Sequence, residues 1–338
     1  MSEDGNGTTV CVAGASGLVG SNIVREALAR GYAVNGTLRN PQAPEKAPYL
    51  MALPGASERL SLHGADMADD GAFASAVAGT DCVFIACLIP MYAGPTGKLA
   101  REMDDEQGYR EIIQPTVDGC LNIMRSAQAA GVENVVICSS TSSTNPVPAV
   151  AVKNEVDHWS DEAEQCRAKK YTSATKTVME KAAIAFASAH GMRLSIIMPT
   201  GMFGPVILPE QLEGNPHAWL RRLMNGEQGR HAAIPNDSTS MSHVHDVARL
   251  FLAAYENESA SGRYFGVYES WHWQDIYKEL ATIIPDMQMP EPLAAVPVAP
   301  TGFDFARRDS LGVAMRDIPT FLRETVDWLA SDPFGKGS

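Results

Sequence analysis

The stretch from Thr8 to Gly20 carries the clearest chemical signal in the chain. A short apolar run, Val10 to Ala13, leads into a G-x-x-G-x-x-G motif, and apolar residues then recur at helical spacing. Glycines at such a strand-to-helix turn allow positive φ angles and let a pyrophosphate approach backbone N–H groups at the positive end of a helix. The motif predicts the phosphate cradle of a dinucleotide-binding fold, and an ordinary tight turn is the alternative. The predicted cofactor contacts of this stretch are Gly14, Ser16, Gly17, Leu18, Val19 and Gly20.

Two basic residues follow the second predicted strand, Tyr32 to Leu38. Arg39 stands roughly twenty residues beyond the glycine turn, where an acidic residue would hold the ribose hydroxyl of NAD, and Lys46 is close by. A guanidinium is well shaped for a phosphate, so this pair predicts NADP(H) as the cofactor in preference to NAD. The alternative is that both are solvated surface charges.

Polar residues also stand at the carboxyl ends of further predicted strands, where ligands bind in open α/β sheets. Asp66 and Met67 follow the strand Leu60 to His63. The Asp66 carboxylate could accept a hydrogen bond from an adenine amino group, cap the next helix, or do both. Ser140 lies in a hydroxyl-rich run after the strand Asn134 to Cys138, and this run could also be a plain polar loop.

Two predicted helices carry further candidates. A long amphipathic helix starts at Tyr109, and Asn122 falls on a largely apolar part of it. A buried amide needs partners, so Asn122 is either structural or part of a polar relay. The second helix, Tyr171 to His190, carries Lys176, and the strand after it runs to Pro199, a predicted cofactor contact.

The elements that would position these residues alternate between strand and helix over roughly 200 residues. Such alternation predicts a parallel sheet with right-handed crossovers, which is a doubly wound (Rossmann) α/β fold. From Gly201 the pattern changes to loops, short helices and proline-rich segments, which indicate a smaller lobe. We therefore expect a cofactor domain at residues 8–201, rejoined by 238–267, and a substrate lobe at 202–237 and 268–332.

Bulk composition excludes several classes of protein. The 338 residues carry a formal net charge of −13 with no basic cluster, which argues against a nucleic-acid surface. No apolar run approaches membrane-spanning length, and the polar, acidic first residues do not form a signal peptide. Six scattered cysteines without a C-x-x-C pair are typical of reduced core thiols. We expect a cytoplasmic protein with no nucleic-acid or membrane partner.

Assembled in order, these segments resemble the extended short-chain dehydrogenase/reductase superfamily. Within it they are similar to the branch of dihydroflavonol reductase, anthocyanidin reductase and cinnamoyl-CoA reductase, and the match runs nearly end to end. The segments that carry it are TVCVAGASGLVGSNIV, GYAVNGTLRNP, LHGADMAD, QPTVDGCLNIM, VVICSS, HWSDEAEQC, TKTVMEKAA, MPTGMFGP, SHVHDVARLFLAAYE and SGRYFG. The resemblance implies reversible hydride transfer between NADPH and a carbonyl, often of an aromatic substrate, by a monomer or homodimer.

The resemblance also implies roles for particular residues. In that chemistry a serine hydroxyl holds the carbonyl oxygen, a tyrosine donates the proton, and a lysine binds the nicotinamide ribose and lowers the pKa of the tyrosine. The serine corresponds to Ser140, the lysine to Lys176, and Asn122 matches the asparagine of the proton relay. The substrate pocket would be lined by Leu88, Thr141, Met202 and Phe203. Apolar residues at those positions could instead belong to the core.

The tyrosine departs from the family spacing, Tyr-x-x-x-Lys. Tyr171 stands five residues before Lys176, and Thr172 occupies the expected place. Five helical steps turn a side chain about 140° away from the lysine, against about 40° for four. A threonine hydroxyl is too short and too weak an acid to substitute simply.

Three hypotheses follow from this displacement. A one-residue bulge of the π type returns Tyr171 to the crevice, and the protein is an ordinary reductase of an aromatic ketone or aldehyde, or acts on the corresponding alcohol. Alternatively, the enzyme uses another proton donor or catalyses a non-redox reaction such as elimination, as a lyase would. In the third hypothesis the chain is an NADP-binding sensor without turnover.

The segment Ser242 to Asp246 places two imidazoles and a carboxylate close together. The resemblance gives His243 a structural place ahead of a helix, and Asp246 could cap that helix. Since no further cluster of metal-binding side chains has matching spacing, we expect no metal site.

Overall fold

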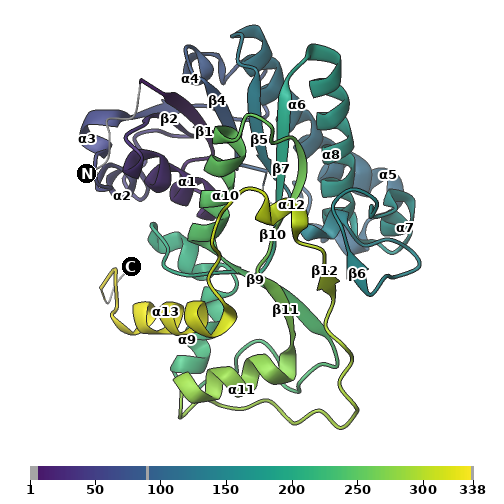
Figure 1. Ribbon diagram of the computed structural model, residues 1–338. Helices are drawn as coiled ribbons and strands as arrows, with labels where there is room; N and C mark the ends of the chain where they lie inside the picture. The colour runs from purple at the N-terminus through teal and green to yellow at the C-terminus, as the bar shows by residue number, and fades with distance from the viewer. Residues whose placement is uncertain (1–6, 89–90, 336–338) are drawn as a thin grey trace.

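The computed structural model describes residues 7–88 and 91–335, and a seven-stranded parallel sheet lies at its centre (Figure 1). The spatial order of the strands is β10-β7-β5-β4-β1-β2-β3. The strands are β1 Thr9–Ala13, β2 Ala33–Leu38, β3 Leu60–Gly64, β4 Cys82–Ile85, β5 Asn134–Cys138, β7 Arg193–Pro199 and β10 Gly262–Gly266. The order reverses at β1, whose neighbours are β2 on one side and β4 on the other. This is a doubly wound sheet, as the sequence predicts.

Both faces of the sheet are buried, which explains why its strands are almost continuously apolar. Along β1, Val10 and Val12 pack into one core and Cys11 and Ala13 into the other. Helices cover each face (Figure 1). The first core also contains residues of α1 Leu18–Ala29 and α10 Val244–Glu256, and the second contains residues of α4 Ala74–Val77, α6 Gln114–Ala129 and α8 Tyr171–His190.

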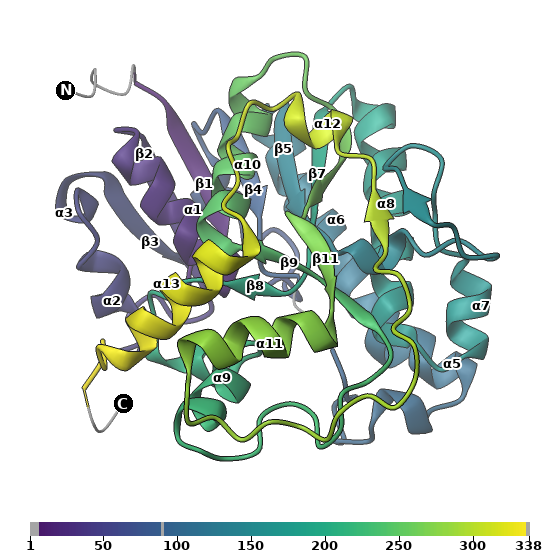
Figure 2. The same cartoon turned by 60° about the horizontal axis from the view of Figure 1, so that its bottom comes forward.

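A lobe with its own core lies beyond the sheet and comes forward in Figure 2. Its three-stranded sheet has the order β11-β9-β8. The lobe is built from β8 Met202–Phe203, η4 Pro209–Glu213, α9 His217–Met224, β9 Ser238–His243, β11 Glu269–His272, α11 Trp273–Ile283 and α13 Ile318–Ala330. Its core is aromatic: Phe203 stacks on Phe321 with ring centroids 5.4 Å apart and meets Trp219 edge-on.

Smaller elements complete the chain. They are α2 Ala47–Met51, α3 Ala56–Arg59, η1 Ala100–Glu102, α5 Asp105–Gly108, η2 Tyr109–Ile113, η3 Thr141–Ser143, β6 Val152–Lys153, α7 Glu162–Arg167, β12 Gly302–Phe303 and α12 Ala306–Asp309. In the described part of the chain, no helix is long and apolar enough to cross a membrane. The signal-peptide expectation rests partly on residues 1–6, which lie outside the described residues.

The predicted elements match closely, with two corrections. The helix expected after His243 begins at Val244 and is capped by His243 itself, not by Asp246: the strand Ser238–His243 ends there, and His243 accepts a hydrogen bond from the His245 N–H. The long helix expected from Tyr109 opens with a π-helical turn, and α6 starts at Gln114 with a proline in its first turn. Proline is favoured there because the first helical N–H groups have no helical acceptor.

The turn between β1 and α1 depends on glycine at two positions. Gly14 has a φ of +86°, and a Cβ atom there would lie 2.7 Å from the Cβ of Cys87. Gly20 lies inside α1, where a Cβ atom would collide with the carbonyl oxygen of Gly14. The two glycines therefore let the helix pack directly onto the turn.

Replacing Gly20 by alanine tests this packing. Alanine in a helix interior is ordinarily favoured over glycine by about 1 kcal/mol. Here the collision with Gly14 outweighs that gain, and Gly20→Ala is expected to lower the free energy of unfolding by about 1–3 kcal/mol. Gly17→Ala is the matched control, since its Cβ would lie 3.4 Å from the same oxygen, an ordinary contact. Denaturant titration measures both, and equal losses would contradict the steric explanation.

Candidate functional site

The carboxyl ends of β1 and β4 meet at the switch point of the sheet, where doubly wound folds bind dinucleotides. The Gly17 N–H donates to the Gly14 carbonyl over 3.0 Å, and Gly17 forms the N-terminal cap of α1 in extended conformation. No side chain caps this helix, and its first turn holds no acidic residue. The start of α1 thus offers backbone N–H groups and a positive dipole end to an anion. These features fit the pyrophosphate of a dinucleotide.

Two side chains that sequence reasoning did not identify hold this turn in place. Thr37, on β2, accepts a hydrogen bond from the Gly14 N–H at 3.1 Å. Gln211, on η4 of the lobe, donates from Nε2 to the Ser16 carbonyl at 2.9 Å and to the Ser21 hydroxyl at 3.1 Å. Thr37 stands in the segment GYAVNGTLRNP, but nothing in that segment marks its contact with Gly14, and Gln211 acts on Ser16 from 195 positions away.

The two basic residues predicted to select NADP(H) differ in their surroundings. Arg39 is exposed, and its side chain makes no hydrogen bond or ion pair with the residues described. Lys46 lies at the start of α2, and its Nζ is 3.2 Å from Oε1 of Glu210. A free guanidinium therefore follows β2 directly, and a paired ammonium stands at the start of α2.

The turn after β3 is stabilised by a hydrogen bond within the turn and by packing against α6. Asp66 Oδ1 accepts the Ala68 N–H at 3.0 Å and so closes a turn. Since no helix begins there, the helix-cap hypothesis is wrong, and the adenine contact stays a prediction. Met67 packs against Gly119, where a Cβ atom would lie 2.9 Å from its sulfur. The glycine in α6 thus leaves room for the Met67 side chain.

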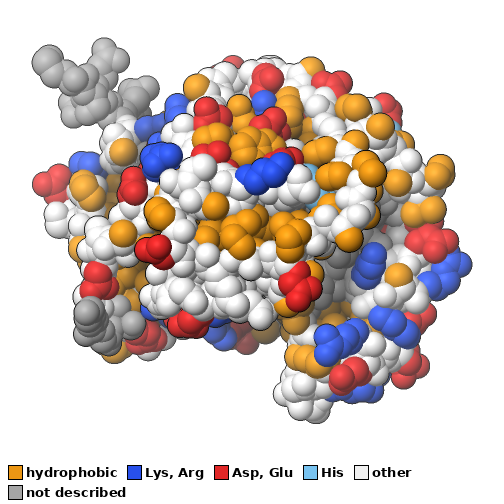
Figure 3. Space-filling view, turned by 90° about the horizontal axis from the view of Figure 1, so that it is seen from below, with side chains coloured by type: hydrophobic (Ala, Val, Ile, Leu, Met, Phe, Trp, Pro, Cys, Tyr) orange, Lys and Arg blue, Asp and Glu red, His pale blue; other side chains and the backbone are white. Residues whose placement is uncertain are grey.

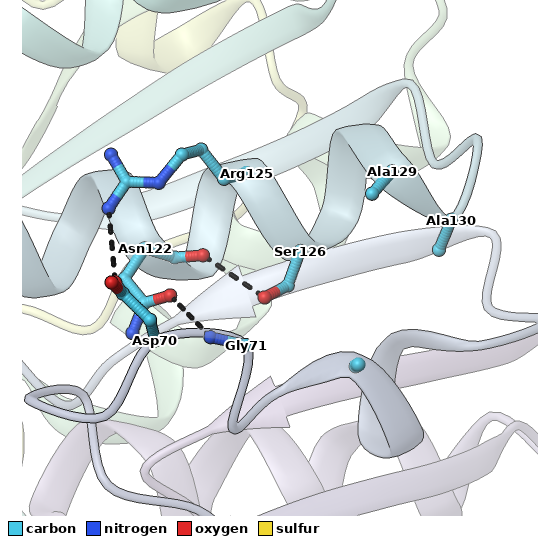
Figure 4. Close-up of a pocket in the computed structure, with 8 residues that line it drawn as sticks. Asp70, Gly71, Asn122, Arg125, Ser126, Ala129 and Ala130 are labelled. Atoms are coloured by element: carbon cyan, nitrogen blue, oxygen red, sulfur yellow. Dashed lines mark hydrogen bonds and ion pairs between the residues drawn. The ribbon is translucent and has the colours of Figure 1, made fainter.

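Asn122 is engaged on this same loop. Its Nδ2 donates to the carbonyls of Met67 and Asp69, and its Oδ1 accepts the Gly71 N–H at 3.1 Å. Figure 4 shows Asn122 beside a surface cavity of about 550 Å³. The cavity is lined by Asp70, Gly71, Ala74, Asn122, Arg125, Ser126, Ala129 and Ala130. In this structure the Asn122 side chain holds the loop, and the proton relay that the resemblance implies stays a prediction.

Lys176 is buried in α8, and its Nζ donates to the Leu88 carbonyl, just beyond β4, over 2.5 Å. Burial lowers the pKa of this ammonium, while the thiols of Cys138, Cys120 and Cys87 lie near enough to influence it. Burial raises the pKa values of those thiols, so they are neutral near pH 7. Lys176 is therefore a desolvated cation at the edge of the sheet.

Ser140 follows β5 at the same edge. Its Oγ accepts the Ser142 N–H at 3.2 Å and donates to no described residue, so its hydroxyl hydrogen is available to a ligand. The two neighbouring serines are anchored. Ser139 Oγ donates to Glu180 in a short hydrogen bond, and Ser143 Oγ accepts from Arg263 at 3.1 Å.

Arg263 and Glu180 form a buried ion pair beneath this loop. Arg263 Nε lies 2.8 Å from Glu180 Oε2, with side-chain exposures of 4% and 0%. The remaining guanidinium N–H groups donate to the carbonyls of Glu155, His158 and Ser143. The Cζ atom of Arg263 also lies 3.6 Å from the ring centroid of Trp159. Every donor of the guanidinium group is directed at a partner, which is the condition for a stable buried charge.

Tyr171 lies away from Lys176. Its ring is fully buried against Gly108, and its hydroxyl donates to Asp105 Oδ1 at 2.6 Å and accepts from Lys169 Nζ at 3.0 Å. Burial and the hydrogen bond to Asp105 raise the pKa of Tyr171. A proton-donating tyrosine of this family would require the opposite shift.

The bulge hypothesis does not hold for α8, because the helix is a regular α-helix from Tyr171 to His190. The π-helical turn lies at Tyr109–Ile113, in a different helix. Thr172, at the family's tyrosine position, donates to the Met91 carbonyl at 2.6 Å.

The predicted substrate residues divide into two groups. Phe203 is a core residue of the lobe and Leu88 is a core residue of the sheet, so the core alternative holds for both side chains. Thr141 and Met202 are partly exposed. Pro199 ends β7 and packs closely on Gly266 of β10. Figure 3 shows the surface hollowed between the lobe and the protruding segment that carries α5 and α7.

The histidine segment is structural. Asp246 is bound by Arg316, whose backbone N–H donates to it at 2.7 Å, and His243 is fully buried. Among residues 7–88 and 91–335, no group of three or more His, Cys, Asp or Glu side chains could hold a metal ion.

Comparison with known proteins identifies the family. Residues 10–267 match the NAD dependent epimerase/dehydratase family. The chain is 33% identical to cinnamoyl-CoA reductase CAD2 of Medicago truncatula over 99% of both chains, and 33% identical to dihydroflavonol 4-reductase of Hordeum vulgare over 87% of this chain and 80% of that one. Vestitone reductase of alfalfa has the same fold, with a TM-score of 0.76, 24% identity and coverage of 97% and 99%.

The chain therefore belongs to the NAD dependent epimerase/dehydratase family, the extended type of short-chain dehydrogenase/reductase. The curated relatives are oxidoreductases, and this chain is an enzyme of that class. The solved structure of yeast methylglyoxal/isovaleraldehyde reductase Gre2 complexed with NADPH shares the fold with a TM-score of 0.74 at 21% identity, over 96% of this chain and 97% of that one.

Removing one member of the buried ion pair tests its role. Arg263→Met leaves the Glu180 carboxylate buried without its counter-ion and is expected to cost about 3–5 kcal/mol of stability. The double variant Arg263→Met, Glu180→Gln removes both charges and should recover part of this loss. Chemical denaturation of the single and double variants measures the coupling, and strict additivity would show that the pair does not act as a unit.

His243 makes the fold sensitive to acid. Burial, assisted by Arg316 and Arg25, lowers the pKa of His243 to about 3, against an ordinary value of 6.5. Because the unfolded chain takes up this proton first, stability is full above pH 6.5 and falls as the pH drops from 6.5 towards 3. His243→Asn keeps a cap acceptor and should flatten this part of the melting temperature–pH profile. The exposed His190 provides the control, and an equal flattening by His190→Asn would refute the assignment.

Proposed function

We propose that this enzyme is an NADPH-dependent reductase of an aromatic ketone or aldehyde, or acts in reverse on the corresponding alcohol. The observation that carries the proposal is the position of Lys176 Nζ, buried on the Leu88 carbonyl at the edge of the sheet that also holds the glycine cradle. The names of the curated relatives, cinnamoyl-CoA reductase and dihydroflavonol 4-reductase, support an aromatic carbonyl substrate. NADPH bound in the cradle would supply the hydride.

Arg39 and Lys46 are the residues suited to the additional phosphate that distinguishes NADPH from NADH. A guanidinium binds phosphate oxygens in pairs, and an ammonium adds a second positive charge. Asp66 and Met67, beyond β3, are suited to the adenine end, and the N-terminus of α1 to the pyrophosphate. The solved structure of Gre2 complexed with NADPH, which has the same fold, supports NADPH as the cofactor.

Different residues of this chain would bind the substrate carbonyl and donate the proton to it. Ser140 Oγ, with its hydrogen available, donates to the substrate oxygen. The proton comes from a group other than Tyr171, whose hydroxyl is bound to Asp105 and Lys169. Lys176 is the acid best suited to replace it, since burial lowers the pKa of its ammonium and, among the described residues, only the Leu88 carbonyl accepts a hydrogen bond from its Nζ.

Substitution of Tyr171 and Lys176 tests which of the two residues donates the proton. Tyr171→Phe removes only the hydroxyl and should leave kcat within about threefold of the wild type. Lys176→Met removes the acid and a cofactor contact, and should lower kcat/KM by about 100-fold or more. Both are followed by the loss of NADPH absorbance with a panel of aromatic and aliphatic ketones and aldehydes.

Thr172→Val serves as the matched control on the same helix turn. Loss of activity in Tyr171→Phe would show that the tyrosine reaches the reacting carbonyl after all. NADPH binding without turnover of any carbonyl in the panel would contradict the proposed reaction, in favour of elimination chemistry or a sensor.

The expected domain limits remain part of the proposal. The separate core of the lobe supports a substrate lobe formed by residues 202–237 and 268–332. Within residues 238–267, α10 and β10 support a return to the sheet domain, whereas β9 Ser238–His243 belongs to the sheet of the lobe. We also infer a cytoplasmic enzyme that works as a monomer or homodimer, without nucleic-acid or membrane partners.

A further inference from the structure

One short segment of the lobe, η4, contacts two separate parts of the predicted cofactor site. Gln211, on η4, binds the Ser16 carbonyl in the glycine turn. Its neighbour Glu210 pairs with Lys46, near the end of β2, with 3.2 Å between Oε1 and Nζ. The two contacts lie at the pyrophosphate end and at the adenosine-phosphate end of the predicted cofactor site.

Gln211 gives this segment a defined position. Its Oε1 accepts the N–H groups of Ile207 and Leu208 at 3.1 and 3.4 Å, while its Nε2 is bound to the glycine turn. The backbone that carries Glu210 is therefore fixed relative to α1. This fixed segment therefore holds the Glu210 carboxylate next to Lys46.

Lys46 is consequently neutralised while Arg39 is not. The Lys46 side chain is only 23% exposed, and Glu210 is its single ion-pair partner within the described chain. Arg39 is exposed and has no described partner. The 2′-phosphate of NADPH would therefore find one unpaired cation, Arg39, and one cation, Lys46, whose charge is already paired with a carboxylate.

We propose that Glu210 is a specificity-determining residue, which limits the preference for NADPH over NADH by competing with the 2′-phosphate for Lys46. The inference rests on the proposed cofactor. A phosphate carries more charge than a carboxylate and also engages Arg39, so it displaces Glu210, but the broken Lys46–Glu210 pair offsets part of the affinity. NADH lacks this phosphate and leaves the pair intact.

Direct binding measurements on the purified full chain test the proposal. Calorimetric titration at low salt, where exposed ion pairs are least screened, gives Kd for NADPH and NADH. Glu210→Gln should tighten NADPH binding by about two- to fivefold, the range that surface ion pairs contribute, and leave NADH unchanged. In a Lys46→Gln background the same substitution should have no effect.

Glu213→Gln is the matched control. It removes an equal charge from the same segment, but Glu213 pairs with Arg221, at 3.0 Å, and not with Lys46. Unchanged NADPH binding in Glu210→Gln, or equal tightening of NADPH and NADH, would overturn the role of Glu210 while leaving the proposed function standing. A wild-type chain that bound neither cofactor, or only NADH, would overturn the proposed function and this inference with it.

Discussion

The buried ion pair between Arg263 and Glu180 is the interaction on which the candidate site depends. It joins three segments distant in sequence: β10, which carries Arg263, α8, which carries Glu180, and the loop after β5, which is held through Ser139 and Ser143. Two charges withdrawn from water are tolerated only when their hydrogen-bonding groups are satisfied. Small rearrangements of this loop would leave donors unpaired, so Ser140 occupies a fixed place between two anchored neighbours.

The same pair fixes the rotation of α8. Glu180 stands four residues after Lys176, so both side chains lie on one face of the helix and point towards the sheet. Turning the helix by one residue, about 100°, would bring Tyr171 towards the lysine's former direction. It would also withdraw Lys176 from the Leu88 carbonyl and Glu180 from Arg263. The displaced tyrosine therefore cannot be recovered by rotation, and its hydroxyl is satisfied by Asp105 and Lys169.

Sequence reasoning succeeded where the controlling forces are local. The turn depends on the positive φ of Gly14 and on the close approach of Gly20 to the Gly14 carbonyl, six residues away, and the strands follow from apolar runs that both faces of the sheet bury. The spacing of Tyr171 and Lys176 indicated that the two side chains diverge on a regular helix, but it left open a bulge that would bring Tyr171 back. The bulge hypothesis was wrong because it considered α8 alone, without the contacts of Glu180.

Contacts between residues far apart in the chain could not be predicted from the sequence. Asp105 lies 66 positions from Tyr171, and Gln211 lies 195 positions from Ser16. The sequence showed that the amide of Asn122 needs partners, but only the positions of Met67, Asp69 and Gly71 identify them. The features that form the cradle and those that orient α8 are thus separable in this chain. The cradle depends on glycine sterics and a helix end, whereas the side chains at the edge of the sheet depend on which groups α8 directs there, and Lys176 is among them while Tyr171 is not.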